Sequence, residues 1–157
     1  MTHDPNCIFC KIIDGEIPSA KVYEDDDVFA FLDISQVTKG HTLIVPKTHV
    51  KNIYETKEDV ASTLFARVPK VARAIEKAFN PVGMNVLSNT GEFAGQSVFH
   101  LHIHLIPRYD ESDGFDAKWI THNDDYTNEE LTAIAQSISE NSKCKIVLGG
   151  SCFSGQK

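Results

Sequence analysis

The segment that most constrains the fold is residues 100–106, which read His-Leu-His-Ile-His-Leu-Ile. Successive side chains of a β-strand point to opposite faces of the sheet, so this alternation predicts imidazoles on one face and aliphatic side chains on the other. We expect a strand from Val98 to Ile106, ended by Pro107, because proline cannot donate a backbone hydrogen bond to a neighbouring strand. The aliphatic face is expected to pack against a helix.

The remaining hydrophobic patterns predict an α+β fold built on a five-stranded antiparallel sheet with two main helices. Short apolar runs between turn residues predict the other strands, at residues 22–24, 28–32, 41–46 and 83–88. Apolar side chains recur every three or four positions over residues 57–79, which predicts an amphipathic helix with a kink or a break at Pro69. A capping-box pattern at Thr127 predicts the start of a last helix, to about residue 140.

Length and charge limit the class of protein. The 157 residues fit one domain, expected over residues 1–140, with a loosely ordered C-terminal tail over residues 141–157. The net charge of −7 disfavours non-specific binding to nucleic acid, and the acidic turn at residues 25–27 is expected to hold solvated charges. No apolar run reaches the ~20 residues of a membrane span, and the N-terminus lacks a secretory pattern. We therefore expect a cytoplasmic protein without nucleic-acid or membrane partners.

Three histidines on one strand face are compatible with three kinds of function. Two of them can share a zinc ion, since histidines at i and i+2 of a strand lie side by side, which would give a catalytic metal site. One imidazole can act as a nucleophile while its neighbours orient it, because an unperturbed imidazole is largely neutral at pH 7. The third possibility is a set of ordinary surface histidines on a half-buried strand.

The same segment is similar to the signature of the histidine triad (HIT) family, His-φ-His-φ-His-φ-φ, in which φ is an apolar residue. The similarity extends from about residue 7 to about residue 110 and includes Leu32-Asp33-Ile34, residues 40–47 and Gly95-Gln96-Ser97-Val98. It implies a HIT-like fold whose members often form two-fold homodimers. It also implies a nucleotidyl hydrolase or transferase for AMP-linked substrates, and hence a purine nucleotide as the partner.

The resemblance implies roles for the matching positions. His102, the middle histidine, would attack phosphorus and form a covalent nucleotidyl-histidine. His104 and Ser97 would donate to the phosphate or the leaving group, and His41 would support the nucleophile. The substrate-binding residues would accept the ribose hydroxyls, enclose the base and face the phosphate: Asp33, Ile34, Phe9, Ile8, Asn89, Gly95 and Gln96.

Cys7 and Cys10 are spaced as in metal-binding or redox Cys-x-x-Cys motifs. Together with His49 and His100 they make a Cys₂His₂ set, which structural zinc prefers, and some members of the resembled family carry zinc at corresponding positions. The expected cofactor is therefore a structural Zn²⁺ that clamps the N-terminal segment to the sheet. A redox function is the alternative, although no thioredoxin-like βαβ pattern surrounds the motif.

The substrate and the reaction are left open by the sequence. Gln96-Ser97 resembles the branch of the family that hydrolyses nucleoside phosphoramidates, whereas Pro107-Arg108 resembles the branch that cleaves dinucleoside polyphosphates. A non-catalytic purine nucleotide-binding adaptor would need the pocket but no nucleophile. A zinc-dependent hydrolase that uses all three histidines would show turnover sensitive to chelators and no covalent adduct.

Overall fold

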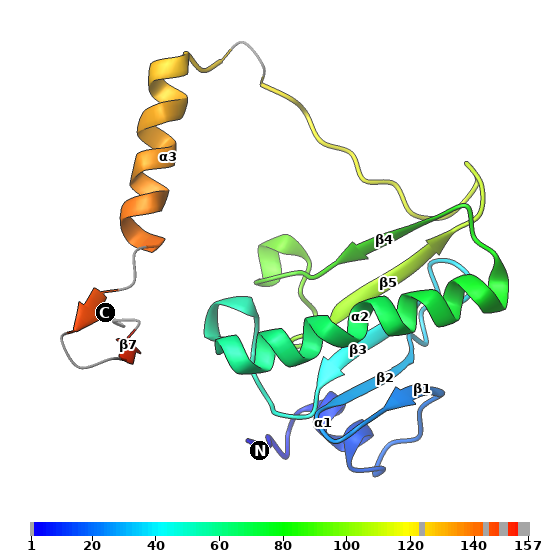
Figure 1. The fold of residues 1–157 in the computed structure, drawn as a ribbon. Helices are drawn as coiled ribbons and strands as arrows, with labels where there is room; N and C mark the ends of the chain where they lie inside the picture. The colour runs from blue at the N-terminus through cyan, green and yellow to red at the C-terminus, as the bar shows by residue number, and fades with distance from the viewer. Residues whose placement is uncertain (1, 123–124, 143–144, 148–150, 154–157) are drawn as a thin grey trace. The chain divides into compact units, whose positions relative to one another are not determined.

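The protein is described here by a computed structural model, which covers residues 2–122, 125–142, 145–147 and 151–153. The chain divides into two compact units, Met1–Asp116 and Ala117–Lys157, and each is described by itself. In the first unit an antiparallel sheet has the strand order β1-β2-β3-β5-β4 (Figure 1). Its strands are β1 (Lys21–Glu24), β2 (Val28–Leu32), β3 (Thr42–Pro46), β4 (Gly83–Leu87) and β5 (Ile103–Arg108). The predicted five-stranded antiparallel sheet is confirmed.

Helix α2 (Glu58–Phe79) covers one face of this sheet (Figure 1). Its buried side chains lie three or four positions apart and pack against aliphatic residues of β2, β3 and the histidine segment. This core contains Leu64, Val68, Val71, Ile75, Val28, Ala30, Ile44, Leu101, Ile103 and Leu105. Each fully buried aliphatic side chain contributes about 1.5–3 kcal/mol of transfer free energy. The aliphatic residues between the histidines therefore pack on a helix, as their alternation predicts.

Helix α2 is continuous through Pro69, so the predicted break is wrong. Proline has no N–H to donate to the carbonyl of Phe65, and this loss costs stability in a helix interior. Val68 and Val71 on either side are buried in the core, and their burial outweighs that cost. The helix ends at Asn80, which takes a left-handed conformation with φ 49° and donates its N–H to the carbonyl of Glu76.

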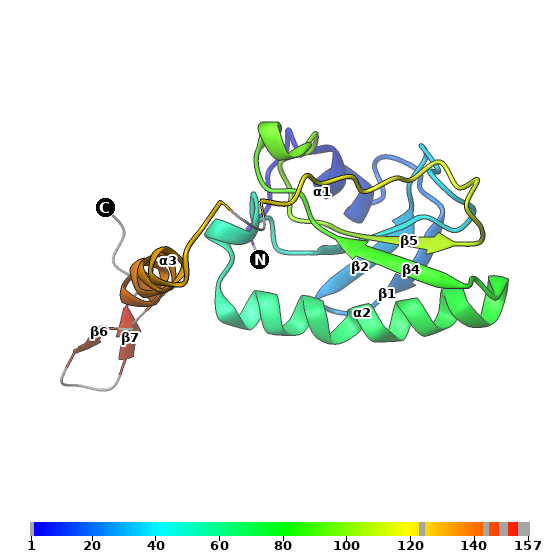
Figure 2. The ribbon, with the colours of Figure 1, turned by 90° about the horizontal axis from the view of Figure 1, so that it is seen from above.

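The opposite face of the sheet is covered by the N-terminal segment. Helix α1 (Ile8–Ile13) lies there together with the short 3-10 helix η2 (Glu92–Ala94) (Figure 2). A second apolar cluster joins α1 to β2 and β3, and it contains Cys7, Phe9, Cys10, Phe29, Phe31, Leu43 and Val45. Another 3-10 helix, η1 (Ile53–Glu55), lies between β3 and α2. The strands β2 and β3 are therefore buried on both faces.

The fifth strand differs from the predicted range, Val98–Ile106. Strand β5 begins only at Ile103, because extending its register with β3 would set Leu101 opposite Pro46, which has no N–H to donate. At the other end, β5 continues through Pro107 to Arg108. Strand β3 pairs with β5 only from Ile103 to Leu105. Beyond Leu105, β5 pairs with β4 alone, and Pro107 lies opposite Met84. A proline is tolerated at such an edge.

The second unit contains α3 (Asn128–Ser142) and the strand pair β6 (Lys145–Val147) and β7 (Ser151–Phe153). Thr127 and Glu130 form the predicted capping box: the N–H of Glu130 donates to the Thr127 hydroxyl (3.2 Å), and the N–H of Thr127 donates to the Glu130 carboxylate (2.7 Å). Much of the predicted tail, including Cys144, lies outside the described residues. The predicted extent of the domain stays a prediction. Among the described helices, none has the length and apolar character needed to cross a membrane.

Candidate functional site

The three histidines of the segment face away from α2 but do not share one environment. His100 is completely buried and His102 is 4% exposed, whereas His104 is only partly buried. His102 donates its Nδ1–H to the carbonyl oxygen of His100 at 2.7 Å. A carbonyl can only accept, so this bond places the lone pair of His102 on Nε2. Burial also lowers the pKa of His102, which favours the neutral and nucleophilic imidazole.

A second hydrogen-bonded chain fixes the protons of His41 and His104. The backbone N–H of Val37 donates to Nδ1 of His41 at 3.4 Å, so His41 carries its proton on Nε2. Nε2 of His41 lies 2.9 Å from Nδ1 of His104 and donates to it. The proton of neutral His104 is therefore on Nε2, a buried atom without a partner among the described residues. An unused donor in this position is available to a bound ligand.

Asp33 lies beside this chain, with a carboxylate oxygen 3.8 Å from Nε2 of His41. Its other oxygen accepts the backbone N–H of Ser35 at 2.8 Å, which fixes the carboxylate at the end of β2. Burial lowers the pKa of His41, although the nearby Asp33 charge opposes the shift. Burial lowers the pKa of His104 to about 4, and His102 and His41 add to that shift. All of these imidazoles are neutral at pH 7.

The predicted base-binding residues differ in exposure. Phe9 is buried, and its ring meets His102 edge-on at 5.3 Å between centroids and Phe31 at 5.4 Å. Ile8 is 47% exposed and Ile34 is 99% exposed. These two side chains are open to contact with a ligand, whereas Phe9 packs against His102.

The loop before the histidines is held by two amide side chains. Gln96 is buried: its Oε1 accepts the N–H of Gly91 (2.9 Å), and its Nε2 donates to the carbonyls of Lys51 (2.8 Å) and Val98 (3.1 Å). Nδ2 of Asn89 donates to the carbonyl of Gly95 at 3.2 Å. Gly95 has φ 86°, a conformation that other residues rarely adopt. These bonds hold the backbone around Ser97, which is exposed.

The four predicted metal ligands come together between α1, the end of β3 and the histidine segment. One donor atom from each of Cys7, Cys10, His49 and His100 lies within 4.8 Å of the others. Sγ of Cys7 is 3.5 Å from Nδ1 of His100, and Sγ of Cys10 is 3.4 Å from Nδ1 of His49 and 3.7 Å from Nδ1 of His100. A tetrahedral ion with Zn–S of about 2.3 Å and Zn–N of about 2.0 Å separates such atoms by about 3.5 Å. The geometry therefore fits zinc.

The charge states in this cluster also suit a cation. Burial raises the pKa of the Cys10 thiol to about 11, so the thiol stays protonated unless a positive charge replaces its proton. Burial lowers the pKa of His100 to about 4, which keeps its imidazole neutral. His100 donates its Nε2–H to the carbonyl of Pro46 at 2.8 Å, and this bond leaves Nδ1 free to bind a metal. Two neighbours of these ligands were not predicted, and no sequence pattern marks them. One is the carbonyl of Pro46, and the other is Asp4, whose carboxylate lies 4.0 Å from Nε2 of His49.

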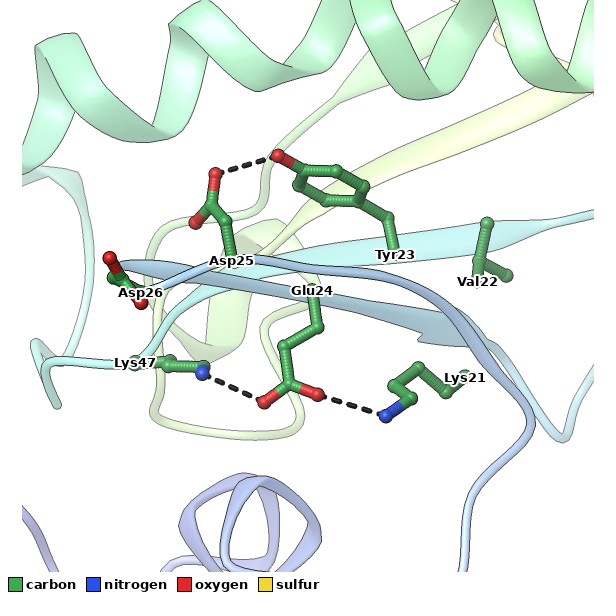
Figure 3. Close-up of a pocket in the computed structure, with 7 residues that line it drawn as sticks. All are labelled: Lys21, Val22, Tyr23, Glu24, Asp25, Asp26 and Lys47. Carbon is green, nitrogen blue, oxygen red and sulfur yellow. Dashed lines mark hydrogen bonds and ion pairs between the residues drawn. The ribbon is translucent and has the colours of Figure 1, made fainter.

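A hollow of about 600 Å³ lies elsewhere, at the β1 edge of the sheet (Figure 3). Three of its charged groups pair with one another: Glu24 accepts Lys47 at 2.7 Å and Lys21 at 2.9 Å. None of the predicted site residues lines it. The hollow therefore has no part in the candidate site.

The arrangement has counterparts among known proteins. Residues 14–111 match the HIT domain. The chain is 63% identical over 135 residues to Protein hit of Bacillus subtilis (strain 168), which covers 86% of this chain and 93% of that protein. It is 38% identical over 138 residues to adenosine 5'-monophosphoramidase hnt1 of Schizosaccharomyces pombe, which covers 88% of this chain and 99% of that protein. A crystal structure of a HIT family protein from Bacillus anthracis has a TM-score of 0.86 at 59% identity, over 88% of this chain and 99% of that chain.

Proposed function

The chain belongs to the HIT family of nucleotide hydrolases and transferases, and on that premise we propose that it cleaves AMP-linked substrates through a covalent adenylyl group on His102. The observation that carries the proposal is the 2.7 Å bond from Nδ1 of His102 to the carbonyl of His100, because it frees Nε2 for attack. A non-catalytic adaptor would have no use for a nucleophile oriented in this way.

The reaction divides into two displacements at phosphorus. Nε2 of His102 forms a bond to the α-phosphorus while the bond from phosphorus to the leaving group breaks, and the leaving group departs with the electron pair and takes up a proton. Water then attacks phosphorus, the bond to Nε2 breaks, and AMP is released with His102 neutral again. The Nε2–H of His104, which has no partner among the described residues, and the hydroxyl of Ser97 donate to phosphate oxygens as their charge rearranges. His41 holds His104 in the tautomer that this requires.

A nucleoside phosphoramidate, in which AMP is linked to an amine, is the substrate we propose. One relative, hnt1, is named for that activity. Arg108, the residue that suggested a polyphosphate, is already bound: its guanidinium donates to Asp113 at 3.0 Å and to Asn85 at 2.9 Å. A dinucleoside polyphosphate is the second candidate, since it presents the same AMP group with a different leaving group.

A structural zinc ion on Cys7, Cys10, His49 and His100 is part of the proposal. When bound, zinc would supply a fixed cross-link and the positive charge that keeps both thiols ionised. The three histidines would not share one ion, because Nδ1 of His100 faces the two thiols and its Nε2 is bound to Pro46. This division of roles counts against zinc-dependent hydrolysis by the whole triad.

We also propose a two-fold homodimer, as the family resemblance implies, and a cytoplasmic location, as expected from the sequence pattern. Sedimentation at micromolar concentration should give twice the chain mass of 17.4 kDa. A mass of one chain would contradict the dimer without affecting the proposed chemistry.

The covalent step is tested by the intact mass of protein quenched within seconds of mixing with excess adenosine 5′-phosphoramidate or diadenosine tetraphosphate. We expect an adenylyl adduct on the wild type and none on a folded His102→Asn variant. The donor that turns over faster identifies the substrate class. Product without any adduct would contradict the covalent mechanism, and neither adduct nor product would favour the adaptor.

The Ser97 hydroxyl is tested separately. Ser97→Ala should lower kcat by about 10- to 1,000-fold if the hydroxyl donates to the transition state. An unchanged kcat would remove Ser97 from the catalytic residues.

A further inference from the structure

We propose that the Cys7–Cys10–His49–His100 cluster is a positioning device for the nucleophile: an ion bound there holds the His100 carbonyl and the Phe9 ring that together orient His102. This inference rests on the proposed function, since it takes His102 as the nucleophile and the cluster as a metal site. It assigns to the cluster a role beyond clamping the N-terminus, namely control of the tautomer and direction of one imidazole.

His100 is attached at three points, and the third attachment is to the nucleophile. Its Nδ1 faces both thiols at 3.5 and 3.7 Å, and its Nε2 donates to Pro46 at 2.8 Å. Its own carbonyl accepts Nδ1–H of His102 at 2.7 Å. The side chain that would bind the ion and the carbonyl that orients His102 therefore belong to one residue. A displacement of the His100 backbone, which a fixed side chain opposes, would move that carbonyl directly.

Phe9 gives the cluster a second contact with His102. It lies between the two cysteines in the sequence, in the six-residue helix α1. Its ring meets His102 edge-on at 5.3 Å and His100 at 6.0 Å. Because both cysteines flank Phe9, an ion that fixes them fixes the position of this ring against the nucleophile. A helix this short has little stability of its own, so its position depends on such contacts.

The cluster itself is weakly held without an ion. A thiol is a poor hydrogen-bond donor and acceptor, and the sulfur–nitrogen distances of 3.4 to 3.7 Å match the edges of a metal tetrahedron. Without the ion, only weak thiol–imidazole interactions would connect the two cysteines to His49 and His100. The carbonyl of His100 and the ring of Phe9 would then be less fixed, and His102 would be free to exchange between its two tautomers.

His49→Asn is the variant that tests this coupling. His49 reaches Cys10 and His100, and none of its described contacts involves His102. We expect the variant to lose its bound zinc. We also expect the His102 ring of the variant to change from the Nδ1–H tautomer to a mixture of both tautomers, as measured by ¹⁵N–¹H correlation spectra. The rate of adenylyl-His102 formation should fall about 10- to 100-fold, as for other residues that orient a site through a metal ligand. The matched control is His122→Asn, a histidine exposed in the second unit, which should change none of the three readouts.

Each outcome decides the proposal. A folded, zinc-free His49→Asn protein with the wild-type His102 tautomer and adenylylation rate would overturn it, and so would a wild type that binds no zinc. The tautomer readout needs no turnover, so a wild type that forms no adduct would contradict the proposed function and leave this test intact. If the variant does not fold, the exchange of zinc for the larger Cd²⁺ in the wild type replaces it. Shifted His102 ring signals would then support the coupling, and unshifted signals would overturn it.

Discussion

Each imidazole near the candidate site has at least one ring nitrogen in a hydrogen bond, and that bond decides the tautomer of the ring. The carbonyl of His100 accepts the Nδ1–H of His102 and leaves a lone pair on Nε2. The carbonyl of Pro46 binds Nε2 of His100 and leaves Nδ1 toward the thiols. Three identical side chains in alternation thus differ in tautomer because their hydrogen-bond partners differ: two backbone carbonyls and, for His104, the side chain of His41. At the scale of the residue, function depends on the tautomer more than on the residue type.

The pH dependence of stability tests the buried state of His104. Burial lowers its pKa to about 4, whereas an unfolded histidine binds its proton near pH 6.5. Between these values the unfolded chain holds more protons, so the free energy of unfolding decreases as the pH falls, by up to about 1.4 kcal/mol per pH unit for this group. His104→Asn removes the titrating group, and we expect a shallower decrease in urea unfolding between pH 6.5 and pH 4. The exposed control His122→Asn should keep the wild-type slope; an equal slope in His104→Asn would contradict the prediction.

At the scale of the element, short segments are placed by side chains that act as backbone partners. The loop between β4 and β5 has Gln96 at its centre, with its amide bound to three backbone groups. The same amide donates to the carbonyl of Val98, the residue at which the sequence predicts the start of the strand.

Gln96→Glu should destabilise this loop and with it the fold. A carboxylate at this position would set a negative oxygen against the carbonyls of Lys51 and Val98, which now accept the amide N–H groups. We expect the free energy of unfolding to fall by about 2–3 kcal/mol at pH 7, and by less at pH 5, where a protonated carboxyl can donate. Denaturant unfolding at both pH values measures this. The exposed neighbour Glu92→Gln serves as the charge-changing control and should have little effect; equal stabilities of Gln96→Glu and wild type would refute the loop's dependence on the amide.

Pro69→Ala should make the protein more stable. Position 69 is exposed in the middle of α2, so alanine adds a helical N–H for the carbonyl of Phe65 without disturbing the core. We expect the free energy of unfolding to rise by about 1–3 kcal/mol, seen as a higher Tm in thermal unfolding. Ser62→Ala, another exposed position of the same helix, controls for helix propensity alone and should add about 0.5 kcal/mol. A gain for Pro69→Ala no larger than that of Ser62→Ala would argue against a missing hydrogen bond.

The sequence predicts those elements whose side chains repeat with a clear period. Helix α2 and the strands β2, β3 and β4 lie within one or two residues of their predicted ranges. The start of β5 could not be predicted, because it depends on the register that brings Pro46 opposite Leu101. Helix α1 is too short to show a period. The members of the Cys7–Cys10–His49–His100 cluster were predicted from their residue types and the family resemblance, but the hydrogen bond between His100 and His102 involves a backbone carbonyl, which no residue type encodes.

At the scale of the whole molecule, hydrogen bonds and ion pairs between residues far apart in the sequence hold the first unit together. Thr38 donates its hydroxyl to the carbonyl of Pro107 at 2.6 Å, and Leu101 donates its N–H to the carbonyl of Val50 at 2.7 Å. The acidic turn between β1 and β2 is a further example. Its Asp25 was expected to be solvated, but its carboxylate pairs with Arg67 of α2 at 2.9 Å. The prediction of solvated charges is therefore wrong for this residue, because sequence alone does not show which helix residue faces the turn.

Asp25 is tied to both the hairpin and the helix, and its removal should weaken the fold in a pH-dependent way. Burial alone would raise the pKa of Asp25, but hydrogen bonds from Arg67, from the hydroxyl of Tyr23 (Figure 3) and from the backbone N–H groups of Asp27 and Val28 outweigh it and hold the pKa well below its usual value. A carboxyl with a lowered pKa stabilises the folded state above its unfolded pKa, near 3.9, and this contribution is lost as the pH falls below that value. Asp25→Asn should therefore lower the free energy of unfolding at pH 7 by about 1–2 kcal/mol, a modest amount because both partners are partly exposed to water.

The difference between Asp25→Asn and the wild type should shrink in urea unfolding measured from pH 4 down to pH 2. Asp26→Asn is the matched control, since Asp26 is exposed in the same turn, and it should have the stability of the wild type at pH 7. A difference that stays constant with pH would show that Asp25 acts through its shape and not through its charge. In that case the difference would come from hydrogen bonds that the second Asp25 oxygen accepts and an amide NH₂ cannot, and the charge of the ion pair with Arg67 would contribute little to holding the hairpin and α2 together.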